Sequence, residues 1–317
     1  MSLAAYKEKF RQLKVNQSGG RFSPHKICML LAVLDLARSG ALTSNRIEYS
    51  PALLERFREY FDAVRAPGDH PKPNYPFFHL KGPLQGRRPS FWHLKAKPGR
   101  ESVLKSMRSA RSVSDVEQNI EYAYLDDELF QLLQDTRAID QLSATLAETW
   151  FHRGLDELGR VVDIQSEVSS YERRLRQLGT SVKDDAKPPA FIRDPAFRRV
   201  VTEMYDYRCA ATGLRLVLPN GSAMVEAAHL IPFGESGDDD PRNGLALTPD
   251  MHWAMDQFLI APDPDFRWQV NPRLDDRIRD HQLFTSLAGK PLILPKEARM
   301  YPRQDALEWR IKAMKSA

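Results

Sequence analysis

The chain has 317 residues, of which 42% are hydrophobic, and a formal net charge of +4 at pH 7. This length predicts two domains rather than one, and the apolar content is enough for packed cores. No stretch approaches twenty apolar residues, which excludes a membrane-spanning protein, and the excess of positive charge favours a polyanionic partner. The first ten residues lack the apolar core of a secretion signal, and two unpaired cysteines fit a reducing compartment, so we expect a cytoplasmic protein.

The N-terminal part is predicted to combine helices with a small sheet. Hydrophobic periodicity and helix start signals predict helices over residues 3–14, 23–37, 51–64 and 114–136. The second of these helices is apolar on most sides and is predicted to be buried. Two short aromatic segments, residues 75–80 and 90–94, are predicted to pair as strands.

A basic segment with interleaved aromatic residues follows, between residues 81 and 111. It contains nine lysines and arginines and a single acid, Glu101. Cationic side chains among aromatic rings favour phosphate contacts combined with stacking on bases or sugars. The alternative is a solvated basic face around a core tryptophan. The candidates for DNA contact in this segment are Arg87, Arg88, Trp92, Lys95 and Lys97.

Two dipeptides in the N-terminal part extend this interpretation. His25-Lys26 opens the apolar helix, and Tyr75-Pro76 begins the first aromatic segment. Together with the two aromatic segments they resemble the sulfur-binding domain of phosphorothioate-dependent restriction endonucleases, over about residues 1–125. The resemblance implies that these four residues lie near a modified phosphate, with Tyr and Pro against the sulfur and His and Lys toward the charge. The alternatives are an ordinary turn, a polar helix start, or recognition of a modified base.

The middle of the chain is predicted to join two halves. Residues 141–178 are expected to form a long charged helix, and the charged, Pro-Pro-containing stretch 181–189 is expected to be a linker. Beyond it, residues 225–231 and 245–248 are predicted strands, and Pro249 starts a helix. The turn-rich segment 233–242 is predicted to be a loop in which the three consecutive acids, Asp238–Asp240, are solvated and bind no metal.

Polar residues of this strand–strand–helix pattern fit metal-dependent phosphodiester hydrolysis. His252 and Asp256 are four residues apart, so on a helix they lie on one face and can hold a divalent cation together. His229, at the end of the first strand, can face that cation and take a proton from water.

These residues resemble the HNH, or ββα-metal, nucleases, and more narrowly the HNH subgroup of bacterial restriction endonucleases, over about residues 196–262. The resemblance implies His229 as general base and Asn243 as the residue that braces the loop and orients the base. It also implies His252 and Asp256 as ligands of a divalent metal ion, Mg²⁺ or Mn²⁺. The chain departs from the family at Ala228, where many members have a further ligand, and either Glu226 or water can take that place.

Cysteine usage bears on a second metal of this family. Many members hold a structural zinc with two cysteine pairs, whereas this chain has only Cys28 and Cys209 and no Cys-x2-Cys pair. We therefore expect no structural zinc, and we expect Cys209 to be a small buried apolar residue.

The sequence as a whole predicts an α+β protein with a DNA-recognition domain over residues 1–140, a helical connector and linker over 141–189, and a ββα-metal nuclease domain over 190–317. The expected function is cleavage of double-stranded DNA that depends on a modification, as in restriction within bacterial defence. The alternatives are a non-catalytic DNA-binding protein with a degenerate HNH fold and an RNA-directed nuclease. Because two strands must be cut with one site per chain, a homodimer is expected.

Overall fold

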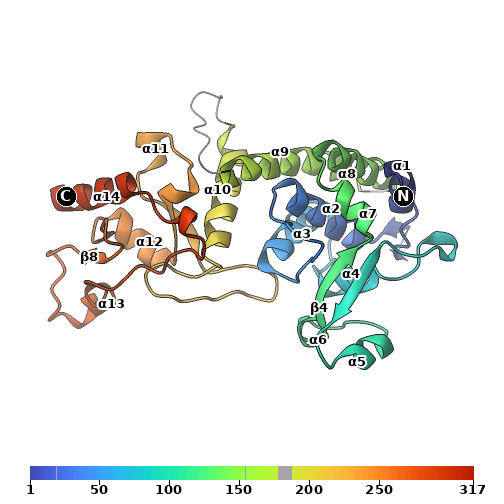
Figure 1. The fold of residues 1–317 in the computed structure, drawn as a ribbon, viewed down its shortest axis with the longest axis horizontal. Helices are drawn as coiled ribbons and strands as arrows, with labels where there is room; N and C mark the ends of the chain where they lie inside the picture. The colour runs from blue at the N-terminus through green and yellow to red at the C-terminus, as the bar shows by residue number, and fades with distance from the viewer. Residues whose placement is uncertain (19, 154, 178–187) are drawn as a thin grey trace. The chain divides into compact units, whose positions relative to one another are not determined.

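The computed structural model describes residues 1–18, 20–153, 155–177 and 188–317. They form two compact units (Figure 1). We call residues 1–173 with 219–222 the N-terminal unit, and residues 174–218 with 223–317 the C-terminal unit. Among the helices that the structure describes, none has the length and apolar character needed to cross a bilayer.

The core of the N-terminal unit is built around one central helix. All residues from Ile27 to Arg38 of helix α2 are buried, as predicted for this apolar segment, and α2 packs against α3, α4 and α8 (Figure 1). The helices of this unit are α1 Leu3–Arg11, α2 His25–Arg38, α3 Pro51–Val64, α4 Asn74–His79, α5 Glu101–Ser106, α6 Val113–Asn119, α7 Asp127–Leu132, α8 Thr136–Phe151 and most of α9 Leu158–Arg176.

Two small antiparallel sheets complete this unit. Strands β1 Gln17–Ser18 and β2 Arg21–Phe22 form a short hairpin before α2. Strands β3 Trp92–Ala96 and β4 Ile120–Leu125 pair with Trp92 opposite Leu125. The mixture of helices with small sheets agrees with the predicted α+β class.

Two predicted elements of this unit are wrong. Residues 74–79 form helix α4 rather than a strand. Pro76 lies in its first turn, where no backbone N–H is needed, and consecutive Phe77 and Phe78 are both buried, which the alternating faces of a strand would not permit against one core. Strand β4 interrupts the predicted helix 114–136, because Ala123 and Leu125 face the core while Tyr122 and Tyr124, which alternate with them, are less buried.

The predicted connecting helix is two helices, α8 and α9. Leu142, Leu146 and Trp150 of α8 are fully buried in the core of the N-terminal unit, so this helix is part of the packing there. Of the predicted linker 181–189, residues 181–187 lie outside the described residues, and residues 188–189 directly precede α10.

The C-terminal unit contains the predicted strand–strand–helix pattern. Strand β5 pairs antiparallel with β6, with Glu226 opposite Leu247 and His229 opposite Gly244, and α12 follows directly. The predicted loop between the strands is more regular than expected, since it contains one helical turn and a short 3-10 segment. The elements of this unit are α10 Ala190–Met204, β5 Glu226–His229, α11 Phe233–Ser236, β6 Gly244–Leu247, α12 Pro249–Asp256, β7 Ile260–Pro262, β8 Trp268–Val270, α13 Gln282–Thr285 and α14 Gln304–Ser316.

Glycine at position 244 lets α10 pack closely on this hairpin. A Cβ atom there would lie 2.7 Å from Val201 Cγ2 and 2.8 Å from Phe197 Cζ, both on α10. These distances are too short for any larger residue, so the hairpin and α10 can approach only with glycine at this point. The close approach brings the Phe197 ring to the end of β5.

Candidate active site and DNA-binding pocket

Three polar side chains meet on the exposed face of β5 and α12. His252 Nδ1 lies 3.0 Å from Glu226 Oε2, and His252 Nε2 lies 3.4 Å from Asp256 Oδ2. The pairing of His252 with Asp256 follows from their spacing on α12, whereas Glu226 reaches the ring from the strand. The two carboxylates are about half exposed, so this cluster is open to solvent and to a ligand.

The donor types in this cluster fit a divalent cation, because Mg²⁺ and Mn²⁺ bind carboxylate oxygens and Mn²⁺ also accepts imidazole nitrogen. In the arrangement seen, both nitrogens of His252 face a carboxylate. Across the part of the chain that is described, no three His, Cys, Asp or Glu side chains already surround a single point. His252 and its neighbouring carboxylates are the residues that would hold such an ion, with the imidazole and a carboxylate as its ligands.

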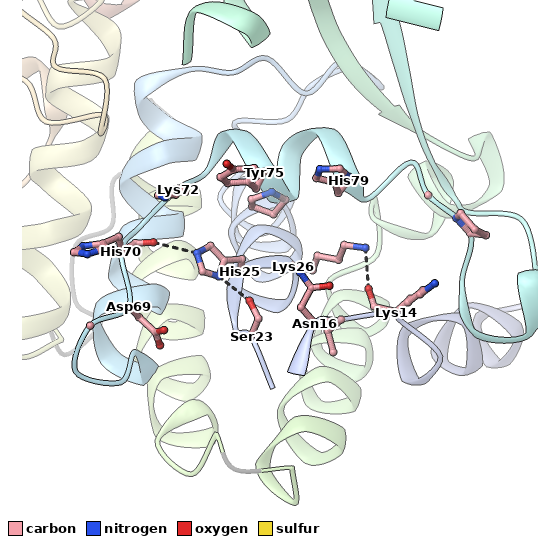
Figure 2. Close-up of a pocket in the computed structure, with 15 residues that line it drawn as sticks. Lys14, Asn16, Ser23, His25, Lys26, Asp69, His70, Lys72, Tyr75 and His79 are labelled. Carbon is pink, nitrogen blue, oxygen red and sulfur yellow. Dashed lines mark hydrogen bonds between the residues drawn. The ribbon is translucent and has the colours of Figure 1, made fainter. Parts of the chain in front are cut away.

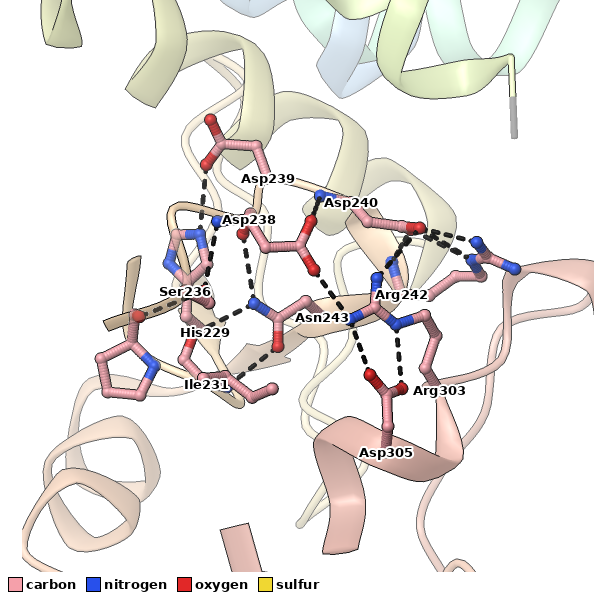
Figure 3. Close-up of polar contacts among 11 residues, drawn as sticks. His229, Ile231, Ser236, Asp238, Asp239, Asp240, Arg242, Asn243, Arg303 and Asp305 are labelled. Carbon is pink, nitrogen blue, oxygen red and sulfur yellow. Dashed lines mark hydrogen bonds and ion pairs between the residues drawn. The ribbon is translucent and has the colours of Figure 1, made fainter. Parts of the chain in front are cut away.

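His229 lies at the end of β5 with its side chain 22% exposed. Its ring stacks on Phe197, with centroids 4.0 Å apart and planes 2° from parallel, and Nε2 lies 3.4 Å from Asp239 Oδ1. Figure 3 shows the ring directed at the loop that follows α11. Within the described residues, His229 makes no hydrogen bond to Glu226, His252 or Asp256.

Asn243 is fully buried and joins the two ends of this loop. Its Nδ2 donates to the carbonyls of Ile231, at 3.0 Å, and Asp238, at 3.2 Å. Its Oδ1 accepts from the Ile231 N–H at 2.9 Å (Figure 3). These three bonds fix the backbone just beyond His229.

The prediction that Asp238–Asp240 are solvated is wrong. The Asp239 side chain is only 2% exposed and lies between His229 and Arg193. Asp238 and Asp240 pair with Arg303, at 2.7 and 3.5 Å. Burial opposes ionisation of Asp240, but its hydrogen bonds from Arg242 outweigh that effect and lower the pKa of the carboxyl group. Arg193 and Arg303 are distant in sequence, and Arg242 belongs to no motif. The composition of the loop therefore does not predict these ion pairs.

Arg310 of α14 is another residue that the sequence did not indicate. Its side chain is buried beneath the site. It donates to the carbonyls of His229 at 2.8 Å, Leu230 at 2.7 Å and Met255 at 3.3 Å, and thereby ties the end of β5 to α12. Burial lowers its pKa to about 10, so it remains charged at neutral pH. No local sequence signal marks an arginine near the C-terminus for this role.

The N-terminal unit contains a separate cavity of about 650 Å³. His25, Lys26, Tyr75 and Pro76, singled out in two distant dipeptides, all line it (Figure 2). Helix α2 supplies the first pair and α4 the second, so the unexpected helix brings Tyr75 and Pro76 to the start of α2. The other residues that line the cavity are Lys14, Val15, Asn16, Ser23, Gly68, Asp69, His70, Lys72, His79, Gly82 and Pro83.

This cavity combines positive charge with an apolar wall. Lys14, Lys26 and Lys72 line it, against one acid, Asp69. Lys26 Nζ donates to the Lys14 carbonyl at 2.8 Å, and burial together with the charge of Lys14 lowers the pKa of Lys26 to about 8. The Tyr75 ring and the prolines form the apolar side.

His25 is the first residue of α2, and two hydrogen bonds hold its ring in place. Its Nε2 donates to the His70 carbonyl at 3.1 Å, which leaves Nδ1 to accept from the Ser23 hydroxyl at 2.8 Å (Figure 2). Burial lowers the pKa of His25, which favours the neutral ring. The His25 ring therefore presents a neutral edge of fixed orientation to this cavity rather than a positive charge.

The basic segment that contains β3 combines exposed cationic side chains with a buried tryptophan. The prediction that Trp92 contacts DNA is wrong, because its ring is fully buried and its indole N–H donates to the Phe77 carbonyl at 3.0 Å. Arg87, Arg88, Lys95 and Lys97 are exposed, as a contact with DNA requires. On the neighbouring strand β4, the partly exposed Tyr122 lies opposite Lys95, and Tyr124 lies opposite His93.

Residues 209–261 match the family model described as HNH endonuclease. The matched range contains Glu226, His229, Asn243, His252 and Asp256, and the match supports the expected HNH endonuclease domain in this part of the chain. Nucleases of this type generally use a divalent metal ion and act on DNA. No curated protein matches the chain.

Proposed function

We propose that the protein is a metal-dependent endonuclease that hydrolyses phosphodiester bonds of double-stranded DNA. The observation that carries the proposal is the meeting of Glu226 with His252 and Asp256 on one exposed face of an HNH endonuclease domain. These residues would hold the divalent cation, which when bound supplies positive charge for the phosphate and the leaving oxygen.

His229 acts in this proposal as the general base. Its ring is partly exposed, so water can reach it, and the stack on Phe197 limits its movement. The imidazole takes a proton from the attacking water as the new bond to phosphorus forms. Asn243 holds the loop and the chain beyond β5 in place, and Arg310 holds the His229 carbonyl from below.

The N-terminal cavity is proposed to receive the modified group of the DNA. Three lysines suit an anionic phosphate, and Tyr75 and Pro76 suit a soft, poorly hydrated atom such as sulfur or the face of a modified base. Arg87, Arg88, Lys95 and Lys97 would add phosphate contacts that are blind to sequence. Cleavage that depends on such a group would be restriction in the cytoplasm of a bacterium, with a homodimer cutting both strands.

The test is cleavage of matched plasmids by the full chain with Mg²⁺ or Mn²⁺. We expect cutting of DNA that contains a backbone or base modification, little cutting of unmodified DNA, and none after chelation of the metal. His229→Ala should lower the cleavage rate by about 10²–10⁴-fold while DNA binding is retained. Equal cutting of all plasmids would show that cleavage does not depend on a modification. Binding without any cutting would support a non-catalytic protein, and cutting of RNA alone would support the RNA-directed alternative.

A further inference from the structure

We propose that Asp239 is a positioning residue for His229, and that its carboxylate selects which nitrogen of the ring accepts the proton. The inference rests on the proposed function, in which His229 is the general base. Asp239 is on the loop between β5 and β6, ten residues beyond His229, and its side chain is almost completely buried against the ring.

The hydrogen-bond geometry defines the tautomer of His229. An ionised carboxylate only accepts hydrogen bonds, so Nε2, 3.4 Å from Asp239 Oδ1, must carry the proton of the neutral ring. The lone pair is then on Nδ1. Among the residues described, Nδ1 of His229 has no hydrogen-bond partner, so it is available to a water molecule.

The stack on Phe197 cannot make this selection by itself. Planes 2° from parallel fix the tilt of the imidazole, but a half-turn about its bond to Cβ leaves the stack intact and exchanges the positions of nitrogen and carbon atoms. A carboxylate at one edge of the ring favours the orientation that places Nε2 beside it. Phe197 therefore fixes the tilt of the His229 ring, and Asp239 fixes which of its two flipped orientations the ring takes.

The loop is built to present this one carboxylate inward. Asp238 and Asp240 are held by Arg303, and Asp240 also by Arg242, as Figure 3 shows. Asp239, between them, meets Arg193 at 3.1 Å from Nη1 to Oδ1.

Arg193 is itself held in place. Its guanidinium lies 3.4 Å from the centroid of the Phe233 ring. The arginine supplies the charge opposite to the buried carboxylate, which a buried acid requires. The position of Asp239 is thus fixed from both sides.

The proton balance of the reaction gives the carboxylate a second effect. Nδ1 takes a proton from water, the hydroxide oxygen bonds to phosphorus, and the P–O bond to the leaving oxygen breaks, with that oxygen taking a proton from solvent. The ring is then an imidazolium with both nitrogens protonated. The charge of Asp239 beside Nε2 stabilises this cation, so its removal should slow the chemical step rather than weaken DNA binding.

The direct test is the tautomer of His229 in the full-length protein without metal or DNA. Nitrogen NMR of protein labelled with ¹⁵N-histidine, with the signal assigned through His229→Gln, should show the proton on Nε2 at a pH where the ring is neutral. In Asp239→Asn the amide can donate to Nε2, so the proton should move to Nδ1, and Asp239→Glu should restore the wild-type signal. Asp238→Asn, which changes the neighbouring carboxylate that pairs with Arg303, should leave it unchanged.

Cleavage kinetics supply the second readout. Asp239→Asn should lower kcat by about 10²-fold or more with KM within about threefold of wild type, and Asp239→Glu should recover part of the loss. A wild-type ring protonated on Nδ1 would overturn the inference even if the Asp239 variants failed to fold. So would an Asp239→Asn protein as active as wild type. If His229→Gln itself retained activity, the assignment of the base would fail, and this outcome is distinct from the others.

Discussion

His252 lies between two carboxylates that come from different elements. Asp256 is one helical turn beyond it, and Glu226 reaches it from the strand that ends in His229. The chain lacks an acid or histidine at position 228, where Ala228 is fully buried and can hold no ligand. The proximity of Glu226 to His252 therefore makes it the protein residue best placed to supply the third ligand.

Metal affinity should follow from this cluster. His252→Ala and Asp256→Ala should each weaken Mn²⁺ binding and abolish cleavage, because each removes a donor that water replaces with lower affinity. Glu226→Gln should cause a smaller loss. Calorimetric titration with Mn²⁺ measures all three, with Asp250→Asn, an exposed acid at the start of the same helix, as the control. Unchanged affinity in both of the first two variants would contradict the assignment.

Lys26 gives the N-terminal cavity a dependence on pH. Its pKa of about 8 means that the ammonium is charged below that pH and becomes neutral above it. Because the DNA is anionic, affinity for the modified duplex should fall as the pH rises from 7 to 9. A bound phosphate favours the charged form and raises the pKa of Lys26 in the complex, so the affinity begins to fall near the pKa of the free protein and levels off above the pKa of the complex.

Fluorescence anisotropy of a labelled modified duplex, without divalent metal, measures this dependence. Lys26→Arg keeps the charge throughout the range and should bind with nearly constant affinity. The same fall in Lys26→Arg as in the wild type would show that another group is responsible.

Among the elements, those around the candidate active site were predictable, whereas α4 and β4 of the N-terminal unit were not. Strands β5 and β6 and helix α12 have short apolar runs and a Pro at the helix start, so local signals agree with the fold. The aromatic run in α4 has high strand propensity, but burial of consecutive rings against α2 overrides it. The same limit holds at the site: His229, Asn243, His252 and Asp256 carry a spacing, whereas Asp239 acquires its role only through Arg193 and the fold of the loop.

Strand β3 should respond differently to changes on its two faces. Trp92→Ala removes a fully buried ring and should lower the free energy of unfolding by about 3–5 kcal/mol. Lys95→Ala, on an exposed position, should change stability by no more than about 0.5 kcal/mol. It should nevertheless weaken binding to modified and unmodified DNA alike and reduce the salt dependence of binding, since a phosphate contact carries no sequence information. Urea unfolding and salt titrations of binding separate the two effects, and a stable Trp92→Ala protein with weakened DNA binding would reverse the assignment.

At the scale of the whole molecule, the N-terminal unit extends well past residue 140. Helix α8 contributes Leu142, Leu146 and Trp150 to the core. Helix α9 contributes Glu172, which forms an ion pair with Arg56 of α3 in which both side chains are fully buried. Removal of one member of a buried pair leaves a charge without that partner and typically costs about 3–5 kcal/mol. Helices α8 and α9, which follow residue 135 in the chain, are therefore needed for the stability of the N-terminal unit.

This packing predicts where the chain can be divided. A fragment of residues 1–140 exposes the surface that α8 and α9 cover and should not unfold cooperatively, whereas residues 1–176, which end with α9, should fold and bind DNA. Urea unfolding followed by far-UV circular dichroism, together with anisotropy on matched modified and plain duplexes, measures both properties. The longer fragment should prefer the modified duplex, and Tyr75→Ala should remove that preference while leaving the weaker, salt-dependent binding to plain DNA. Cooperative unfolding of the shorter fragment would contradict the boundary, because it would show that the core is complete without Leu142, Leu146 and Trp150.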